Sequence, residues 1–93
     1  MTFNSRISWY KKMVVKELKN SLTDRIKIDT VYNGYNDTFI VILTDEKTND
    51  KFKTTFENFT EELLMGLDLK TITIETLIRY KSFIPILYFK WCS

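Results

Sequence analysis

The beginning of the chain has the apolar spacing of an amphipathic helix. Apolar side chains recur at intervals of three and four residues, at Ile7, Tyr10, Val14, Leu18 and Leu22. This interval places them along one stripe of a helical surface. Polar residues that suit helix ends precede and follow the run. The pattern predicts a helix from about Ser5 to Leu22 whose apolar stripe faces the core.

Three runs with the character of β-strands come next. In residues 25–32 and 51–56, successive side chains alternate between the two faces of a strand. This period of two is typical of half-buried strands. Between them, Thr38–Thr44 contains an unbroken series of β-favouring residues. Polar turns at 33–37 and 45–50 separate the three runs. We expect a three-stranded antiparallel meander with Thr38–Thr44 in its centre.

Two shorter helices are predicted after the strands. Asn58 and Glu61 have the spacing of a capping box before a stripe made by Phe59, Leu63 and Leu67. A last helix is predicted from Thr73 to Phe83, before Pro85 stops it. One face of this helix carries Ile74, Leu77, Ile78 and Lys81. Residues 86–91 favour extended structure and are expected to add a strand or to pack across the core.

Length and composition agree with one small folded unit. The 93 residues include 44% hydrophobic and 15% aromatic side chains, enough to fill one core. Only 2 glycines and 1 proline are present, so no flexible linker is expected. We therefore predict a single globular domain, 1–93, of the α+β class with the order α-β-β-β-α-α.

Charge is divided along the chain although the net charge is only +2. Residues 1–27 carry a net charge of +5, residues 28–76 carry −6, and residues 77–93 carry +3. A dedicated nucleic-acid binder is usually more basic over its whole length. This mixed distribution favours contact with another protein at least as well. It also leaves self-association open, through head-to-tail contact or through an exposed edge strand.

The residues that carry most enzyme chemistry are scarce. The sequence has no histidine and one cysteine, Cys92, so no disulfide within the chain is expected. Gly34 and Gly66 stand alone and form no phosphate-binding loop. We predict no enzyme activity, no cofactor and no metal. Because no long apolar stretch or signal-peptide pattern is present, a cytoplasmic protein without a membrane partner is expected.

The outer face of the first helix is a candidate binding surface. It carries Trp9, Lys12, Met13, Lys16 and Lys19. At about 100° per residue, Trp9 lies away from the core stripe and close to the lysines. A tryptophan among lysines suits a protein interface or a nucleic-acid surface. The alternative is that Trp9 packs beneath the C-terminal segment, against Phe89 or Trp91, and that the lysines form an ordinary solvated face.

The middle of the chain supplies a second candidate surface, made of carboxylates. Its members are Asp45, Glu46, Asp50, Glu57, Glu61 and Glu62. A solvated turn and acidic residues near a helix start explain them equally well. The first turn adds Tyr32 and Tyr35, which either contact a partner or support the hairpin.

The order of elements can be compared with two known families. Double-stranded-RNA-binding domains share α-β-β-β-α, but their second helix is basic, whereas Glu61 and Glu62 lie at that place here. The order, and a composition rich in Lys, Asn, Ile and Thr, resembles small phage anti-CRISPR proteins that inhibit Cas9. The resemblance implies a phage or mobile-element protein that binds and inhibits a host nuclease or defence complex. The alternative is a nucleic-acid-binding regulator that uses the basic first helix.

Overall fold

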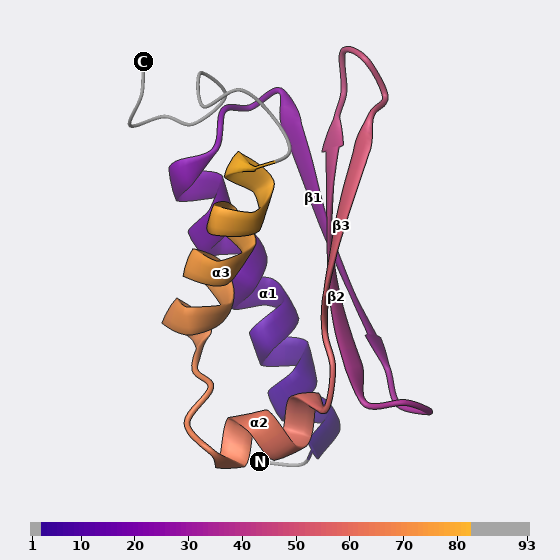
Figure 1. Cartoon of the computed structure of the whole chain (residues 1–93), viewed down its shortest axis with the longest axis vertical. Coiled ribbons are helices and arrows are strands. Elements are labelled where there is room, and N and C mark those ends of the chain that lie inside the picture. The colour runs from indigo at the N-terminus through magenta and orange to yellow at the C-terminus, as the bar shows by residue number, and fades with distance from the viewer. Residues whose placement is uncertain (1–2, 83–93) are drawn as a thin grey trace.

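Helices cover one face of a three-stranded sheet, and among the residues that the structure describes none covers the other face (Figure 1). The computed structural model of the chain describes residues 3–82. In chain order its elements are α1 (Phe3–Ser21), β1 (Ile26–Asn33), β2 (Thr38–Asp45), β3 (Lys51–Phe56), α2 (Phe59–Leu64) and α3 (Leu69–Lys81). α1 and α3 pack side by side, and α2 lies across one end of the molecule. The predicted α+β class and element order are confirmed.

The sheet is an antiparallel meander with strand order β1-β2-β3, so the central position predicted for β2 is confirmed. Its helix-facing residues form the core together with the α1 stripe. Buried apolar side chains are Ile26, Ile28, Phe39, Val41, Leu43 and Phe56 from the sheet, Ile7, Val14 and Leu18 from α1, and Leu22 directly after α1. The opposite sheet face carries Val31, paired with Ile40 across the strands, and several lysines.

The start of α3 differs from the sequence prediction. The helix begins at Leu69 rather than Thr73, because Asp68 acts as its N-cap and accepts a 2.8 Å hydrogen bond from the Thr71 N–H. Its buried residues are Ile72, Thr73, Thr76 and Tyr80. The face with Ile74, Leu77, Ile78 and Lys81 lies toward solvent, with Leu77 half-buried.

Threonines occupy part of the buried face of α3, so the most apolar face of this helix is not the buried one. The hydroxyl of Thr76 donates to the carbonyl of Ile72 at 2.8 Å, and that of Thr73 donates to the carbonyl of Leu69 at 2.9 Å. A threonine whose hydroxyl is satisfied within its own helix can be buried at small cost. The core stripe of α3 is therefore partly polar in sequence. The predictions for Phe83, for Pro85 and for residues 86–91 lie outside the described residues.

Candidate protein-binding surface

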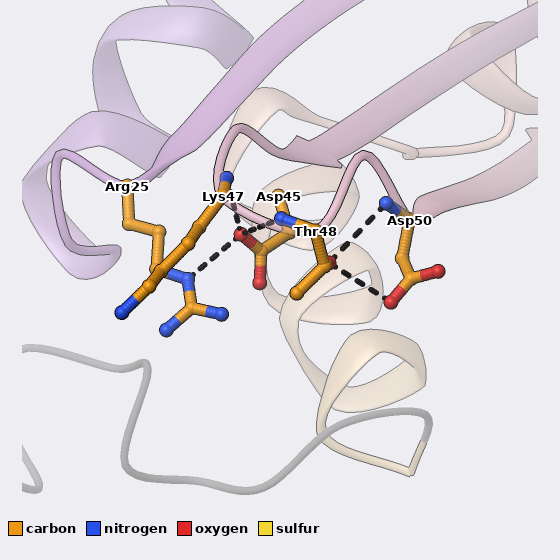
Figure 2. A network of polar contacts seen from close by, with 5 residues as sticks. All are labelled: Arg25, Asp45, Lys47, Thr48 and Asp50. Atoms are coloured by element: carbon orange, nitrogen blue, oxygen red, sulfur yellow. Dashed lines mark hydrogen bonds and ion pairs between the residues drawn. The ribbon is translucent and has the colours of Figure 1, made fainter.

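One of the predicted partner-binding acids holds two loops together instead. Asp45 is only 5% exposed. Its Oδ1 accepts hydrogen bonds from Arg25 Nε at 2.7 Å and from the Lys47 backbone N–H at 2.9 Å (Figure 2). These contacts, the Arg25 bond first, lower the pKa of the Asp45 carboxyl to about 2. Asp45 therefore joins the start of β1 to the β2–β3 loop and is not free to bind a partner.

The remaining predicted acids are exposed but do not form one surface. Glu46 and Asp50 lie in the β2–β3 loop, where the Thr48 hydroxyl donates to Asp50. Glu57, Glu61 and Glu62 lie at the other end of β3, around the start of α2. The 6 residues of β3 lie between the two groups. A strand of 6 residues is about 20 Å long. A continuous acidic surface across all six residues is therefore not present.

Asp37, which the sequence analysis did not select, organises the end of the molecule that carries α2. Its carboxylate accepts hydrogen bonds from the Tyr32 hydroxyl at 2.6 Å and from both the backbone N–H and the hydroxyl of Thr60, at 3.0 and 2.6 Å. The Phe59 N–H donates to the backbone carbonyl of Asp37 at 2.9 Å. The β1–β2 hairpin is thus tied directly to the first turn of α2.

The pKa values of this network follow from the same contacts. Burial raises the pKa of the Asp37 carboxyl, but hydrogen bonds from Thr60 and Tyr32 outweigh it and hold the pKa below its usual value. The hydrogen bond to Asp37, aided by burial, raises the pKa of Tyr32 to about 12. Tyr32 therefore supports the hairpin by donating a hydrogen bond to Asp37. This is one of the two roles that the sequence leaves open for the hairpin tyrosines.

The predicted capping box of α2 is wrong in its chemistry, although Asn58 does occupy the N-cap position. Asn58 has a left-handed backbone, with φ of 52°, and its side chain forms no capping hydrogen bond. Asp37 accepts from the N-terminal turn instead, from 23 residues earlier in the chain. No local sequence signal identifies a cap supplied across such a distance.

Phe59 connects this network to an exposed tryptophan. Phe59 is fully buried and stacks on Phe39, with ring centroids 4.6 Å apart. Its edge meets Tyr10 at 5.9 Å, and Tyr10 in turn meets Trp9 at 5.0 Å. Trp9 itself is 44% exposed. A chain of aromatic contacts therefore runs from the core to a side chain on the surface, which fixes the position of Trp9.

Large apolar side chains are exposed around α2. Leu64 is 87% exposed and Met65 is 76% exposed, immediately before Gly66 ends the helical turn with φ of 112°. Tyr35, at the hairpin tip, is fully exposed. A hollow of about 200 Å³ lies between the start of α1 and α2, against Arg6 and Leu64. α2, the first turns of α1 and the β1–β2 turn lie at the same end of the molecule (Figure 1). We call this part of the molecule the α2 end; its exposed residues are Trp9, Tyr35, Leu64 and Met65 with Glu57, Glu61 and Glu62.

Carboxylates border the α2 end on the side of β3 and α3. A second hollow, of about 400 Å³, is lined by Glu57, Glu62 and Glu75 together with Arg79. Arg79 is occupied by structural contacts, because it donates to the Thr54 hydroxyl at 2.6 Å and forms a 3.5 Å ion pair with Glu75. The border of the surface is therefore acidic.

The basic face of α1 has the composition that the sequence predicts. Lys12, Lys16 and Lys19 are exposed and Met13 is half-buried. Trp9 lies on the same outer surface, away from the buried stripe. Phe89 and Trp91, its alternative neighbours, lie outside the described residues. Whether a partner uses this face stays a prediction.

Comparisons with protein-family models, with curated protein sequences and with solved structures found no match to this chain. Within residues 3–82, none of the helices is both long and apolar enough to cross a lipid bilayer. The assignment of a function therefore depends on the surface chemistry alone.

Proposed function

We propose that this chain is a small protein-binding module whose α2 end contacts another protein. The single observation that carries the proposal is the exposure of Leu64, Met65, Tyr35 and Trp9 at one end of the fold. Exposed apolar and aromatic side chains gathered in one region typically mark protein interfaces. The Asp37 network and the buried Phe59 fix the start of α2 against the hairpin and α1, so less backbone entropy is lost on binding.

The acidic border indicates the chemistry of the partner. Glu57, Glu61 and Glu62 complement a basic rim, such as a nucleic-acid-binding groove has. We therefore propose an inhibitor, encoded by a phage or mobile element, that occupies such a groove on a host nuclease or defence complex in the host cytoplasm. The anti-CRISPR-like order of elements supports this narrower form of the proposal.

An affinity experiment with matched variants tests the module. Wild-type protein, a Leu64→Glu/Met65→Glu variant and a Val31→Glu control are immobilised and exposed to a low-GC bacterial lysate. Val31 is also exposed, but it lies on the open face of the sheet. We expect a nucleic-acid-processing enzyme to be retained by wild type and control and lost with the double variant. Retention by all three proteins, or by none, would contradict the proposed surface.

A second candidate function is favoured by the basic face of α1. Lys12, Lys16 and Lys19 are exposed beside Trp9, an arrangement that suits contact with phosphates and a stacked base. Binding would weaken as salt rises, with the slope of log affinity reduced by about one for each lysine removed. Absence of a gel shift at low salt with duplex and single-stranded probes would exclude it.

A further inference from the structure

The central strand β2 is apolar on both of its faces. Phe39, Val41 and Leu43 are buried in the core beneath the helices, whereas Ile40 and Ile42 lie on the opposite face and are half-buried. An antiparallel sheet with one solvated face normally alternates apolar and polar residues along each strand. Within residues 3–82, no element covers the second face (Figure 1). That face is therefore a candidate contact surface.

The strand register surrounds this apolar centre with lysines. Val31 pairs with Ile40, and Ile42 lies between Asp29 of β1 and Lys53 of β3. The next row of the sheet consists of Lys27, Thr44 and Lys51. All three lysines are exposed, against a single aspartate. We call this surface the open sheet face: Val31, Ile40 and Ile42, bordered by Lys27, Lys51 and Lys53.

The aromatic residues of the three strands lie on the other side of the sheet. They are Tyr32, Phe39, Phe52 and Phe56. Tyr32 and Phe39 contact Phe59 there, and Phe52 contacts Tyr80. A sheet that binds single-stranded nucleic acid presents aromatic rings on which bases stack. An aliphatic patch with a lysine border suits instead a protein surface that combines apolar side chains with carboxylates.

The α2 end of a second copy has this complementary chemistry. Leu64 and Met65 are exposed, and the carboxylates of Glu57, Glu61 and Glu62 are exposed close to them in the sequence. Apolar side chains would meet apolar side chains, and carboxylates would meet lysines. α2 lies across one end of the molecule, whereas the open sheet face runs along the strands (Figure 1). One copy can therefore use both surfaces at once.

We propose that the open sheet face binds the α2 end of a second copy of this chain. Each copy gives its α2 end to one neighbour and its open sheet face to another, a heterologous contact that adds copies head to tail. The inference uses the same α2 end as the proposed function but needs no foreign protein. Self-association and partner binding therefore compete for that end.

Sedimentation of the purified full-length chain tests the contact. The mass of wild type should rise from micromolar to millimolar concentration at low salt and fall when salt screens the charges. Lys51→Glu/Lys53→Glu should lower the association constant by about tenfold or more, because attraction to the carboxylates becomes repulsion. Lys12→Glu/Lys16→Glu is the matched control. It reverses two exposed lysines on α1 and should leave association unchanged.

A mixture of two variants identifies the contact as heterologous. Leu64→Glu/Met65→Glu alters the α2 end but keeps the open sheet face, and Lys51→Glu/Lys53→Glu does the reverse. At concentrations where wild type associates, each variant alone should be monomeric. An equimolar mixture should form one-to-one pairs that grow no further, since each pair has one intact contact. Circular dichroism checks that both variants are folded.

Several outcomes would overturn the proposal. One is a wild-type chain that stays monomeric at every concentration, and another is a mixture of the two variants that forms no pairs. Association that Lys51→Glu/Lys53→Glu leaves intact would place the contact on another surface. A nucleic-acid gel shift that this variant loses would assign the open sheet face to nucleic acid. The proposed function is tested separately, because this variant should still retain the lysate enzyme.

Discussion

Each end of the molecule is held by one aspartate, but the two aspartates have different partners. Asp45 is satisfied by the guanidinium of Arg25 and by N–H groups of its own loop. Asp37 is satisfied by neutral donors, the Tyr32 hydroxyl and the N–H and hydroxyl of Thr60. The first network links two neighbouring loops, whereas the second fixes the start of a helix.

The surroundings of the two networks differ as much as their partners. The β2–β3 loop beside Asp45 exposes charged and polar side chains, while Leu64 and Met65 are exposed beside the Asp37 network. A surface that binds another protein needs apolar area in a fixed position. We therefore expect substitutions at the α2 end to weaken both the folded state and partner binding. Substitutions around Asp45 and the β2–β3 loop, which we call the Asp45 end, should weaken only the folded state.

The largest effect is expected from Phe59→Ala. Phe59 is fully buried between Phe39, Tyr10 and Tyr32. Removal of a buried aromatic ring lowers the free energy of unfolding by about 3–5 kcal/mol. Urea unfolding measures the loss, and Phe59→Leu, which fills part of the space, should lose less. A loss similar to that of an exposed substitution such as Tyr35→Ala would show that Phe59 is not the centre of this end.

Asp37→Ala ranks next, with a loss of about 2 kcal/mol, at the upper end of the range for N-cap removal. The substitution leaves Thr60 and the Tyr32 hydroxyl without their acceptor. Amide hydrogen exchange should accelerate at Thr60 and in α2 before it does so in β2. Asp50→Ala, in the exposed loop at the other end, is the matched control. Equal losses of unfolding free energy in Asp37→Ala and Asp50→Ala would show that the two ends of the molecule do not differ in this way.

The same comparison shows what the sequence could reveal. The α1 stripe and the central β2 run are local patterns with a strong period, so element order and most of the core follow from them. The roles of Asp37 and Asp45 depend on partners 23 and 20 residues away. Both sites look like ordinary turn residues in the sequence. The position of Trp9 away from the buried stripe follows from the helical period alone.

The exposure of Leu64 and Met65 at the α2 end could not be derived from the local sequence pattern either. The apolar spacing assigns Phe59, Leu63 and Leu67 to one helical stripe and does not select Leu64. The short α2 ends at Leu64, and Gly66 then turns the chain, so Leu64 and Met65 remain outside the core. The stop is local, because Gly66 has a positive φ and the Leu67 N–H donates to the carbonyl of Glu62. Which apolar side chains stay exposed beside it depends on tertiary packing, and apolar spacing does not give that.

Tyr32→Phe should have a smaller effect, about 1 kcal/mol, the usual value of one hydrogen bond. The ring still contacts Phe59, and only the donor to Asp37 is lost. Because the pKa of Tyr32 is raised from 10.0 to about 12, the folded state holds this proton more tightly. Its stabilising contribution is complete below pH 10 and is lost as the pH rises to about 12. Alkaline unfolding of wild type and Tyr32→Phe should therefore converge in this interval.

The smallest effect is expected from Asp45→Asn; it is present at neutral pH and fades in acid. The pKa of Asp45 is lowered from 3.8 to about 2, so its carboxylate stabilises the fold above pH 4. That contribution decreases as the pH falls from about 4 to 2, because the unfolded chain takes up the proton first. Asp45→Asn should flatten the acid limb of the stability profile, whereas Asp50→Asn should not. If Asp45→Asn also abolished partner binding at neutral pH, the Asp45 end would be part of the interface and the division between the two ends would fail.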